Sequence, residues 1–487
     1  MQKYPEIVIK PIHPKDMTID DWIDDFNHFY KLIKENFCYL WLKERFTGYN
    51  WLDLKKKYFA RIKNAKNVYQ ILETFWDAVT ALQNAHTVIV RPSMFDSFFK
   101  QDHWAQKTPP FNAIFIPEVQ EAMNYWRSSL EQIIKKRYGM NFEVLIFYDR
   151  GEYKIFDGYG SWKKTYGEGT TSVMAVNGKP IDEAVSECYE TGILDWDFNR
   201  KKIFLWRITP IHFGQKANFT IKKSTGEEKR VIFDSGYEYT YDNPYKMIKT
   251  RFKTEMLPDK RIGYIRIKDF MDEHIDEDHD QLMEFYTHVE KYDWIIIDVR
   301  RNEGGSFNCW MKNVISPLGR EKMVSKMYLA YRSGKYVNLF RKLSQSNINS
   351  IVSKEQFDNL PPEITEQDFT LYEYTQTVDP SQEIDFSGKI ILLVDGITFS
   401  ATDAFALFCK ETKFAEIYGT PTGGDGISDS PIFYVLPNSK LVIRFTPAMG
   451  IDYSGSANEE VRVQPDKYVE WDYSNFDDVV DQVLKSL

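Results

Sequence analysis

Ser400 is the residue whose setting in the sequence first suggests chemistry. It follows the apolar segment KIILLVDG (389–396) and begins the segment SATDAFALFCKET (400–412). This order predicts a buried strand, a short loop, and a helix with Ser400 at its N-terminus. Such a serine is either an ordinary N-cap or a nucleophile, and caps are far more frequent. As a nucleophile it would rely on the N–H of Ala401 to stabilise an oxyanion.

A pair of glycines follows a second apolar segment. The segment DWIIIDVR (293–300) leads into Asn302, Glu303, Gly304 and Gly305. Glycines at the carboxyl end of a buried strand let the backbone approach a ligand closely. Gly304 or Gly305 would supply a second oxyanion N–H, unless the pair forms a plain turn between strand and helix.

His86 is the candidate general base. It lies between a helix-like segment and the strand-like VIV (88–90). A histidine with an ordinary pKa of about 6.5 suits proton transfer near neutral pH. A lone histidine is usually structural, so His86 matters only if it takes the proton of Ser400.

The composition argues against several classes of protein. The 487 residues include 71 acidic and 62 basic side chains, a formal net charge of −9. A nucleic-acid partner is therefore not expected, because phosphate binding needs a basic surface. The four cysteines are far apart and form no CxxC pair, so we predict neither a disulfide framework nor a structural zinc site.

Metal binding and membrane insertion are also not expected. The segment HIDEDHD (274–280) has side chains that could bind a metal, but its acids suit the first turn of a helix and its spacing fits no standard site. We predict no metal and no organic cofactor. The N-terminus shows no apolar signal-peptide core, and no stretch of 18 apolar residues occurs, so we expect a cytoplasmic protein without a membrane span, with an exported protein whose leader has been removed as the alternative.

The order of elements predicts three regions. Residues 1–92 read as helical and carry His86, because apolar residues recur at three- and four-residue spacing from about Thr18 to Gln83. Residues 93–255 contain a helix and then short strands with Gly and Asn turns. Residues 256–487 alternate apolar strands with helices, which predicts an α/β domain with a parallel sheet.

Several motifs, taken in order, resemble one family. The C-terminal processing peptidases and their tricorn relatives have an apolar strand with a D-x-R-x-N-x-G-G-like loop, a nucleophile loop, a G-x-x-T-x-G stretch and a G-V-x-P-D-like stretch. The matching segments here are LQNAHT (82–87), DWIIIDVRRNEGG (293–305), KIILLVDGITFSATDAFA (389–406), IYGTPTGGDG (417–426) and ANEEVRVQPD (457–466).

This resemblance implies a fold and an activity. The catalytic domain would be ClpP/crotonase-like. SVMAVNGKPIDE (172–183) would belong to a PDZ-like module that binds an extended peptide at a sheet edge. The chain would then be a serine peptidase acting on a peptide or protein, and many relatives assemble, so a homo-oligomer is possible.

The catalytic arrangement implied is the branch with a histidine base. In the Ser-Lys branch a lysine follows the nucleophile, but here Asp425 takes its position, and an ordinary carboxylate is too weak a base. In the tricorn-like branch His86 would be the base, supported by Glu459 or Glu460, with Glu460 slightly preferred. The family's supporting serine is replaced by Ala85, unless Thr87 or another residue supplies the hydroxyl.

Three aromatic residues suggest a substrate with an apolar side chain. Phe399 adjoins Ser400, and Phe307 and Trp310 follow the glycines, so the three could line an apolar pocket. Two alternatives remain open: a catalytically inactive ligand- or peptide-binding protein on the same scaffold, and a crotonase-like acyl-thioester enzyme. The second would need a coenzyme A pocket, for which no basic residues are identified.

Overall fold

The computed structural model describes residues 7–100, 103–138, 144–158, 171–214, 216–234, 251–343, 348–470 and 477–487. They form two compact units, each assembled from separate stretches of the chain. Unit 1 consists of Met1–Asp242, Gly334–Leu343 and Ser430–Pro447. Unit 2 consists of Asn243–Ser333, Ser344–Asp429 and Ala448–Leu487.

The first part of unit 1 is helical, as the spacing of its apolar residues predicts. Thr18 begins the first helix with a capping box, in which its side chain and that of Asp21 satisfy each other's backbone N–H groups. The helices of unit 1 are α1 (Ile19–Asn36), α2 (Leu40–Thr47), α3 (Lys55–Lys63), α4 (Val68–Thr80), α5 (Pro92–Lys100), α6 (Pro117–Tyr138), α8 (Ile181–Ser186) and α12 (Lys335–Leu343).

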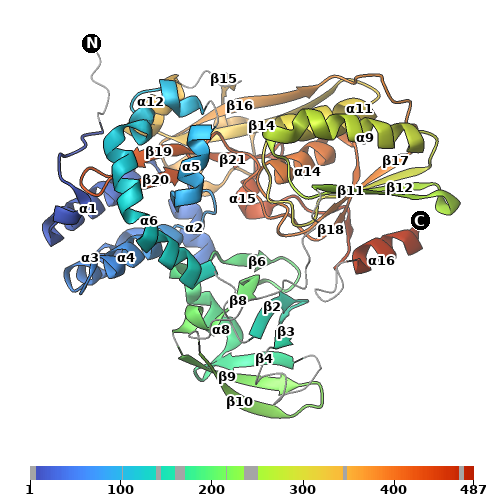
Figure 1. Ribbon diagram of the computed structural model, residues 1–487. Coiled ribbons are helices and arrows are strands. Elements are labelled where there is room, and N and C mark those ends of the chain that lie inside the picture. Colours follow the sequence, from blue (N-terminus) through green and yellow to red (C-terminus); the bar gives the residue numbers. More distant parts are fainter. Residues whose placement is uncertain are drawn as a thin grey trace. The chain divides into compact units, whose positions relative to one another are not determined.

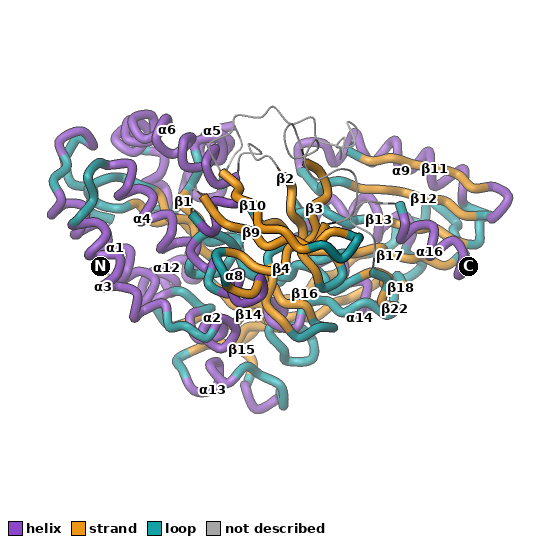
Figure 2. The backbone as a smooth tube through the Cα atoms, turned by 90° about the horizontal axis from the view of Figure 1, so that it is seen from below, coloured by secondary structure: helices purple, strands orange, loops and turns teal. Residues whose placement is uncertain are grey.

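The strands of unit 1 form several sheets. One sheet runs in the order β10-β9-β4-β3-β2-β8, and β2, β3, β4, β9 and β10 lie side by side in Figure 2. A smaller sheet runs β1-β20-β19. The strands are β1 (Val88–Ile89), β2 (Val144–Asp149), β3 (Glu152–Gly158), β4 (Thr171–Val176), β5 (Lys179–Pro180), β6 (Asp195–Asp197), β7 (Lys202–Phe204), β8 (Arg207–Ile208), β9 (Lys216–Lys223), β10 (Glu228–Asp234), β19 (Ile432–Val435) and β20 (Val442–Phe445).

Unit 2 contains the parallel sheet expected from its apolar strands. The order is β11-β12-β13-β17-β18-β22; β11 is antiparallel to β12, and the other pairs are parallel. Figure 1 shows β11, β12, β17 and β18 with α9 and α14 beside them. The strands are β11 (Phe252–Leu257), β12 (Ile262–Ile267), β13 (Trp294–Asp298), β17 (Lys389–Val394), β18 (Glu416–Gly419) and β22 (Lys467–Tyr468).

A second, antiparallel sheet of unit 2 runs β15-β16-β14-β21. Its strands are β14 (Met323–Arg332), β15 (Ile348–Val352), β16 (Phe369–Val378) and β21 (Ala448–Ile451). The helices of unit 2 are α9 (Ile275–Val289), α10 (Phe307–Trp310), α11 (Ser316–Leu318), α13 (Pro362–Glu366), α14 (Ala401–Thr412), α15 (Asn458–Val461) and α16 (Asp478–Ser486).

The compact units cut across the regions expected from the sequence. The hairpin formed by β19 and β20 falls within the predicted catalytic region, yet β20 pairs with β1 and belongs to unit 1. Helix α12 likewise belongs to unit 1. Parts of the predicted region 93–255, among them residues 139–143, 159–170 and 235–250, lie outside the described residues.

Candidate active site

The loops that carry Ser400 and the two glycines leave the same edge of the parallel sheet of unit 2. Strands β13 and β17 are adjacent and parallel, with Ile297 opposite Leu392. Ile297 and Leu392 are fully buried, as the apolar runs predict. Because parallel neighbours end at one edge, the segments after Asp298 and after Val394 start side by side.

Ser400 has an unusual backbone conformation. It occupies the N-cap position of α14 with φ 56° and ψ −127°, and its side chain makes no capping hydrogen bond to the helix. A non-glycine residue in this region of φ/ψ space is strained, and such strain persists where the surroundings impose it. The ordinary N-cap interpretation is therefore wrong for Ser400.

A second serine, next to the glycine pair, is a structural residue. Ser306 is the N-cap of α10, and its hydroxyl accepts a hydrogen bond from the N–H of Asn308 at 3.3 Å. Its φ of −112° is ordinary extended backbone. The backbone conformation and the capping hydrogen bond therefore distinguish Ser306, which caps its helix, from Ser400, which does not.

The glycine loop passes directly beside Ser400. A Cβ built on Gly304 would lie 2.8 Å from the Cβ of Ser400 and 2.9 Å from the N of Ala401, and Gly304 has φ 106°. A Cβ on Gly305 would lie 2.2 Å from the carbonyl oxygen of Phe270. Both glycines are therefore required by close approach as well as by backbone conformation.

The two glycine N–H groups have different partners. The N–H of Gly304 donates to Oδ1 of Asn302 at 2.9 Å, so this donor is already engaged. Within the described part of the chain, no hydrogen bond is recorded for the N–H of Gly305 or Ala401, and Gly305 is exposed. Of the two expected glycine donors, Gly305 rather than Gly304 therefore has an N–H available to a ligand.

Asn302 joins the glycine loop to the nucleophile helix. It is fully buried, and its Oδ1 also accepts from the hydroxyl of Thr402 at 2.7 Å. Its backbone carbonyl accepts from the N–H of Phe399 at 3.1 Å. No role was predicted for Asn302 or Thr402, although a polar residue between a buried strand and two glycines was an available signal for Asn302.

A third loop, which contains Gly424 and Asp425, is bonded to the backbone of Ser400. The N–H of Ser400 donates to the carbonyl of Gly424 at 3.1 Å, and Phe399 and Gly424 form an isolated parallel bridge. Asp425, which stands where the Ser-Lys branch has a lysine, follows with φ 55° and is 1% exposed. The backbone of this loop thus supports the conformation of Ser400.

The two candidate supporting acids differ in burial. Glu459 is 6% exposed, and its Oε2 lies 3.7 Å from Nη1 of Arg462. Glu460 follows it in α15 and is exposed. A carboxylate that orients a histidine needs a site sheltered from water, so the slight preference for Glu460 is replaced by a preference for Glu459.

His86 belongs to unit 1, whereas Ser400 belongs to unit 2. It is half-buried in the turn between α4 and β1, and its carbonyl accepts from Nη1 of Arg444 at 3.2 Å. Oδ1 of Asn84 accepts from the hydroxyls of Thr87 at 2.8 Å and Thr446 at 3.3 Å. The turn is therefore held by polar side chains, and the Thr87 hydroxyl proton is engaged with Asn84.

The three aromatic candidates do not share one environment. Phe399 and Phe307 are half-buried. Trp310 is fully buried and stacks on Phe405 of α14, with ring centroids 5.5 Å apart. Trp310 is thus a core residue that no substrate side chain can reach, and the prediction that it lines a pocket is wrong.

A buried ion pair stabilises the strand end that precedes the glycine loop. Arg300 donates from Nη2 to Oδ2 of Asp298 at 2.7 Å, and the hydroxyl of Tyr264 donates to the same oxygen at 2.8 Å. Burial by itself would raise the pKa of Asp298, but the Arg300 charge and these hydrogen bonds hold it below its ordinary value. Asp298 is therefore ionised and structural.

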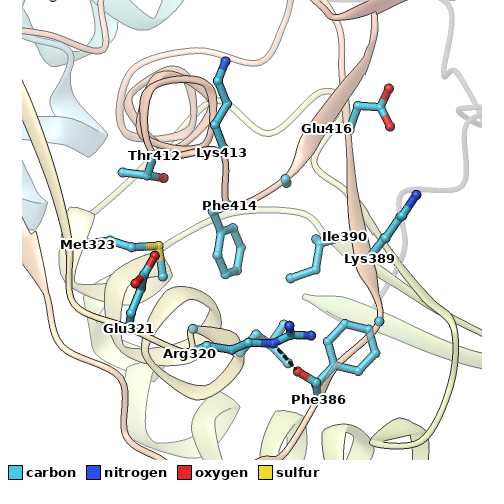
Figure 3. A pocket seen from close by; sticks show the side chains of 14 residues that line it. Arg320, Glu321, Met323, Phe386, Lys389, Ile390, Thr412, Lys413, Phe414 and Glu416 are labelled. Atoms are coloured by element: carbon cyan, nitrogen blue, oxygen red, sulfur yellow. Dashed lines mark hydrogen bonds between the residues drawn. The ribbon is translucent and has the colours of Figure 1, made fainter.

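A hollow of about 370 Å³ in unit 2 lies at the opposite end of α14 (Figure 3). Its lining includes Lys413 and Phe414, directly after α14, and Lys389, where β17 begins. Ser400 follows the other end of β17, so this hollow is not part of the candidate site. Within the described ranges, no three His, Cys, Asp or Glu side chains are arranged to hold a metal ion.

The N-terminal acids of HIDEDHD occupy the first turn of α9, as predicted, where Asp276, Glu277 and Asp278 face the positive end of the helix. The four cysteines are buried free thiols. Among the helices that the structure describes, none combines the length and the apolar character needed to cross a bilayer.

Comparison with known proteins finds a family match over part of the chain. Residues 261–469 match the model of peptidase family S41. Mature CPAF is similar in structure, with a TM-score of 0.56 and 12% identity over 96% of this chain and 97% of that chain. Mature CPAF complexed with lactacystin has a TM-score of 0.54 and 12% identity, and the match covers 96% of this chain and 97% of that chain.

A putative peptidase from Parabacteroides merdae has a TM-score of 0.48 and 15% identity, and the match covers 96% of each chain. No curated protein matches the chain. The family match spans the glycine loop, Ser400 and Glu459, which are the parts of unit 2 that the geometry brings together. The chain therefore carries a peptidase family S41 region at residues 261–469 and is a serine-type peptidase.

Proposed function

We propose that Ser400 is the nucleophile that attacks the carbonyl carbon of a peptide bond. The observation that carries this proposal is the strained backbone of Ser400 at the start of α14, with a side chain that does not cap the helix. Strain of this kind at a helix N-terminus is typical of a site held for chemistry. The fold would be the ClpP/crotonase-like one that accompanies such a site.

The oxyanion of the tetrahedral intermediate would be held by the N–H groups of Ala401 and Gly305. The Ala401 N–H lies in the first turn of α14, where the helix dipole also favours negative charge. Gly304 contributes by allowing the loop to pass next to Ser400, while its own N–H remains bonded to Asn302. Phe399 and Phe307 are the remaining candidates for contacting an apolar substrate side chain.

His86 is proposed as the general base on the strength of the LQNAHT segment. It would take the proton of Ser400 on attack and give it to the leaving amine, after which water would hydrolyse the acyl-enzyme. Glu459 is the proposed acid that orients the imidazole, because it is the sheltered member of the pair Glu459 and Glu460.

The substrate would be a peptide segment of a protein. The segment with the PDZ-like sequence pattern forms β4, β5 and the start of α8. Strand β4 lies between β9 and β3 in the sheet of unit 1. A module of this kind would bind an extended peptide by strand addition. The regions 1–92, 93–255 and 256–487 remain our proposal for the helical, PDZ-like and catalytic parts.

A fluorophosphonate probe tests the nucleophile and the base on the full chain. We expect labelling of Ser400 that is lost in Ser400→Ala and retained in Ser306→Ala, which removes a capping serine of the same unit. His86→Ala should slow labelling by about 100-fold or more. Labelling of a different residue would refute Ser400 as the nucleophile, and unchanged labelling in His86→Ala would remove His86 as the base.

The two acids can be separated by one matched pair of variants. Glu459→Gln should reduce peptide hydrolysis by about 100-fold, whereas Glu460→Gln should leave it within about twofold of the wild type. A large loss of hydrolysis in Glu460→Gln with little change in Glu459→Gln would instead assign the supporting role to Glu460.

The second candidate function is an inactive peptide-binding protein on the same scaffold. Two observations favour it: Asp425 replaces the lysine of the Ser-Lys branch, and the Thr87 hydroxyl proton is engaged with Asn84 beside Ala85. Peptide binding without probe labelling or hydrolysis would support this function over catalysis.

A further inference from the structure

Asp403 is a fully buried carboxyl group in the first turn of α14, three residues after Ser400. Its Oδ1 accepts a hydrogen bond from the hydroxyl of Thr422, and its Oδ2 accepts from the N–H of Gly426 at 3.2 Å. The side chain of Asn458 is a third partner. Asp403 thus contacts two segments that are distant in the sequence.

The first of these segments supports Ser400. Gly424, two residues after Thr422, accepts the hydrogen bond from the Ser400 N–H. A Cβ built on Gly426 would lie 2.5 Å from Oδ2 of Asp403 and 2.8 Å from the carbonyl oxygen of Ser400. The loop over residues 422–426 is therefore packed against both Ser400 and Asp403 without space for a side chain at Gly426.

The second segment carries the proposed supporting acid. Asn458 precedes Glu459 in α15, and its Oδ1 accepts from the N–H of Gly426 at 3.1 Å. The Thr422 hydroxyl oxygen accepts from the N–H of Val463 at 2.9 Å, just beyond α15. The two segments are thus bonded to each other as well as to Asp403, and the carboxylate lies at the centre of the network.

We propose that Asp403 is a positioning residue of this peptidase, whose carboxylate holds the 422–426 loop and α15 against the first turn of α14. It thereby maintains the strained conformation of Ser400 and the location of Glu459. The inference rests on the proposed function for its catalytic consequence. The hydrogen-bond network itself is independent of that function.

The ionised form of Asp403 suits this role, although burying its charge lowers the stability of the folded chain. The carboxylate offers four acceptor sites to its donors, whereas protonation would turn one of these sites into a donor and an asparagine would replace one whole oxygen with a donating NH2 group. Burial raises the pKa of Asp403 to about 6, against the lowering effect of its hydrogen bonds and of Arg462. The other charged side chains on the two segments are Asp425, Glu459 and Glu460.

The sign of the pH dependence follows from this shift. The pKa is raised from the ordinary value of 3.8, so the folded chain holds this proton more tightly than the unfolded chain. The contribution of Asp403 to stability therefore decreases as the pH rises from about 4 to about 6, and the cost persists above that range. A buried acid that lowers stability at neutral pH is expected where its charge serves the site.

Asp403→Asn in the full chain tests the proposal, with Glu411→Gln as the matched control. Glu411 lies on the same helix, away from Ser400, where it accepts from the Ser325 hydroxyl at 2.6 Å. Three measurements are needed: hydrogen exchange of peptides covering residues 422–426 and 458–463, the rate of fluorophosphonate labelling, and the Tm between about pH 5 and about pH 8.

We expect Asp403→Asn to speed exchange in these two segments and to slow labelling by about tenfold or more, while Glu411→Gln does neither. The Tm of the variant relative to the wild type should rise with pH, because only the wild type carries the cost of the charge. A merely structural role would give the same trend of the Tm with pH but would leave the labelling rate of Ser400 unchanged.

Exchange and labelling within about twofold of the wild type would overturn the proposal, as would faster exchange spread evenly over unit 2. If Asp403→Asn does not fold, Thr422→Val should reproduce the loss and Thr422→Ser should not. If the wild type is not labelled at all, the proposed function fails, and the exchange data alone then decide for or against the positioning role.

Discussion

At the scale of single residues, Ser400 and Gly304 show how backbone conformation prepares a site. Ser400 is held at φ 56° and ψ −127°, and Gly304 at φ 106° approaches it closely. Neither conformation is favoured by an ordinary L-residue, so the surrounding hydrogen bonds must maintain both. The strain at each of these two positions therefore leads to a prediction about stability that is independent of catalysis.

Ser400→Gly should be more stable than Ser400→Ala by about 1 kcal/mol, because glycine relieves the backbone strain that alanine retains. Chemical denaturation of the full chain measures this difference. Ser306→Gly and Ser306→Ala are the control, since Ser306 is an N-cap with an ordinary φ of −112°, so their difference measures the advantage of glycine at an unstrained N-cap, which the Ser400 difference should exceed. Equal stability of the two Ser400 variants would show that the conformation is not strained.

Gly304→Ala should lower the free energy of unfolding by about 3 kcal/mol and abolish labelling of Ser400. The new methyl group would meet the Cβ of Ser400 at 2.8 Å. Gly48→Ala is the control, because Gly48 also has a positive φ, 79°, with no atom within 4 Å of the added Cβ. Similar losses in both variants would mean that φ, rather than crowding, decides the effect.

At the scale of elements, the N-terminus of α14 is tied to the end of β13 through Thr402 and Asn302. Thr402→Val should destabilise the chain by about 1 kcal/mol and slow labelling, because it removes a buried hydrogen bond while keeping the shape. Thr402→Ser keeps the hydroxyl and should behave like the wild type.

A double-mutant cycle with Asn302→Ala tests whether the two residues act together. The coupling energy between Thr402 and Asn302 should be about 1 kcal/mol, measured by denaturation of the single and double variants. Additive effects would show that each residue acts through other partners.

At the scale of the whole molecule, unit 1 depends on a segment that is far away in the sequence. Residues 430–447 belong to unit 1, and Leu441, Val442 and Ile443 in this segment are fully buried. The carboxylate of Asp25 in α1 accepts from the N–H groups of Asn438 at 2.8 Å and Ser439 at 2.7 Å. Cutting the chain between the predicted regions would therefore destabilise unit 1.

A fragment of residues 256–487 should accordingly fail to fold cooperatively, because β20 would lose β1 and the buried side chains of residues 430–447 would be exposed. Near-ultraviolet circular dichroism and urea denaturation check this outcome. Co-expression with residues 1–255 should restore a cooperative transition. A fragment that unfolds cooperatively by itself would refute the interdependence.

The pattern of residues was sufficient to predict the elements that carry the site. Apolar runs identified β13, β17 and α14, and the order of the elements placed Ser400 and the glycines in loops that follow buried strands; the pairing of β13 with β17 brings these loops to one sheet edge. The resemblance in motif order pointed to the peptidase family whose model matches residues 261–469. These features depend on local sequence, which periodicity and turn residues record directly.

Other properties were decided only by tertiary structure. Whether Ser400 caps its helix, which glycine N–H is engaged, and whether Trp310 or Glu460 is buried all depend on contacts between distant segments. The role of Asp403 also emerges only when residues 422–426 and 458–463 meet α14. Residue type and spacing determined what chemistry was available, whereas burial and hydrogen bonding, which no local pattern encodes, determined which groups are free to perform it.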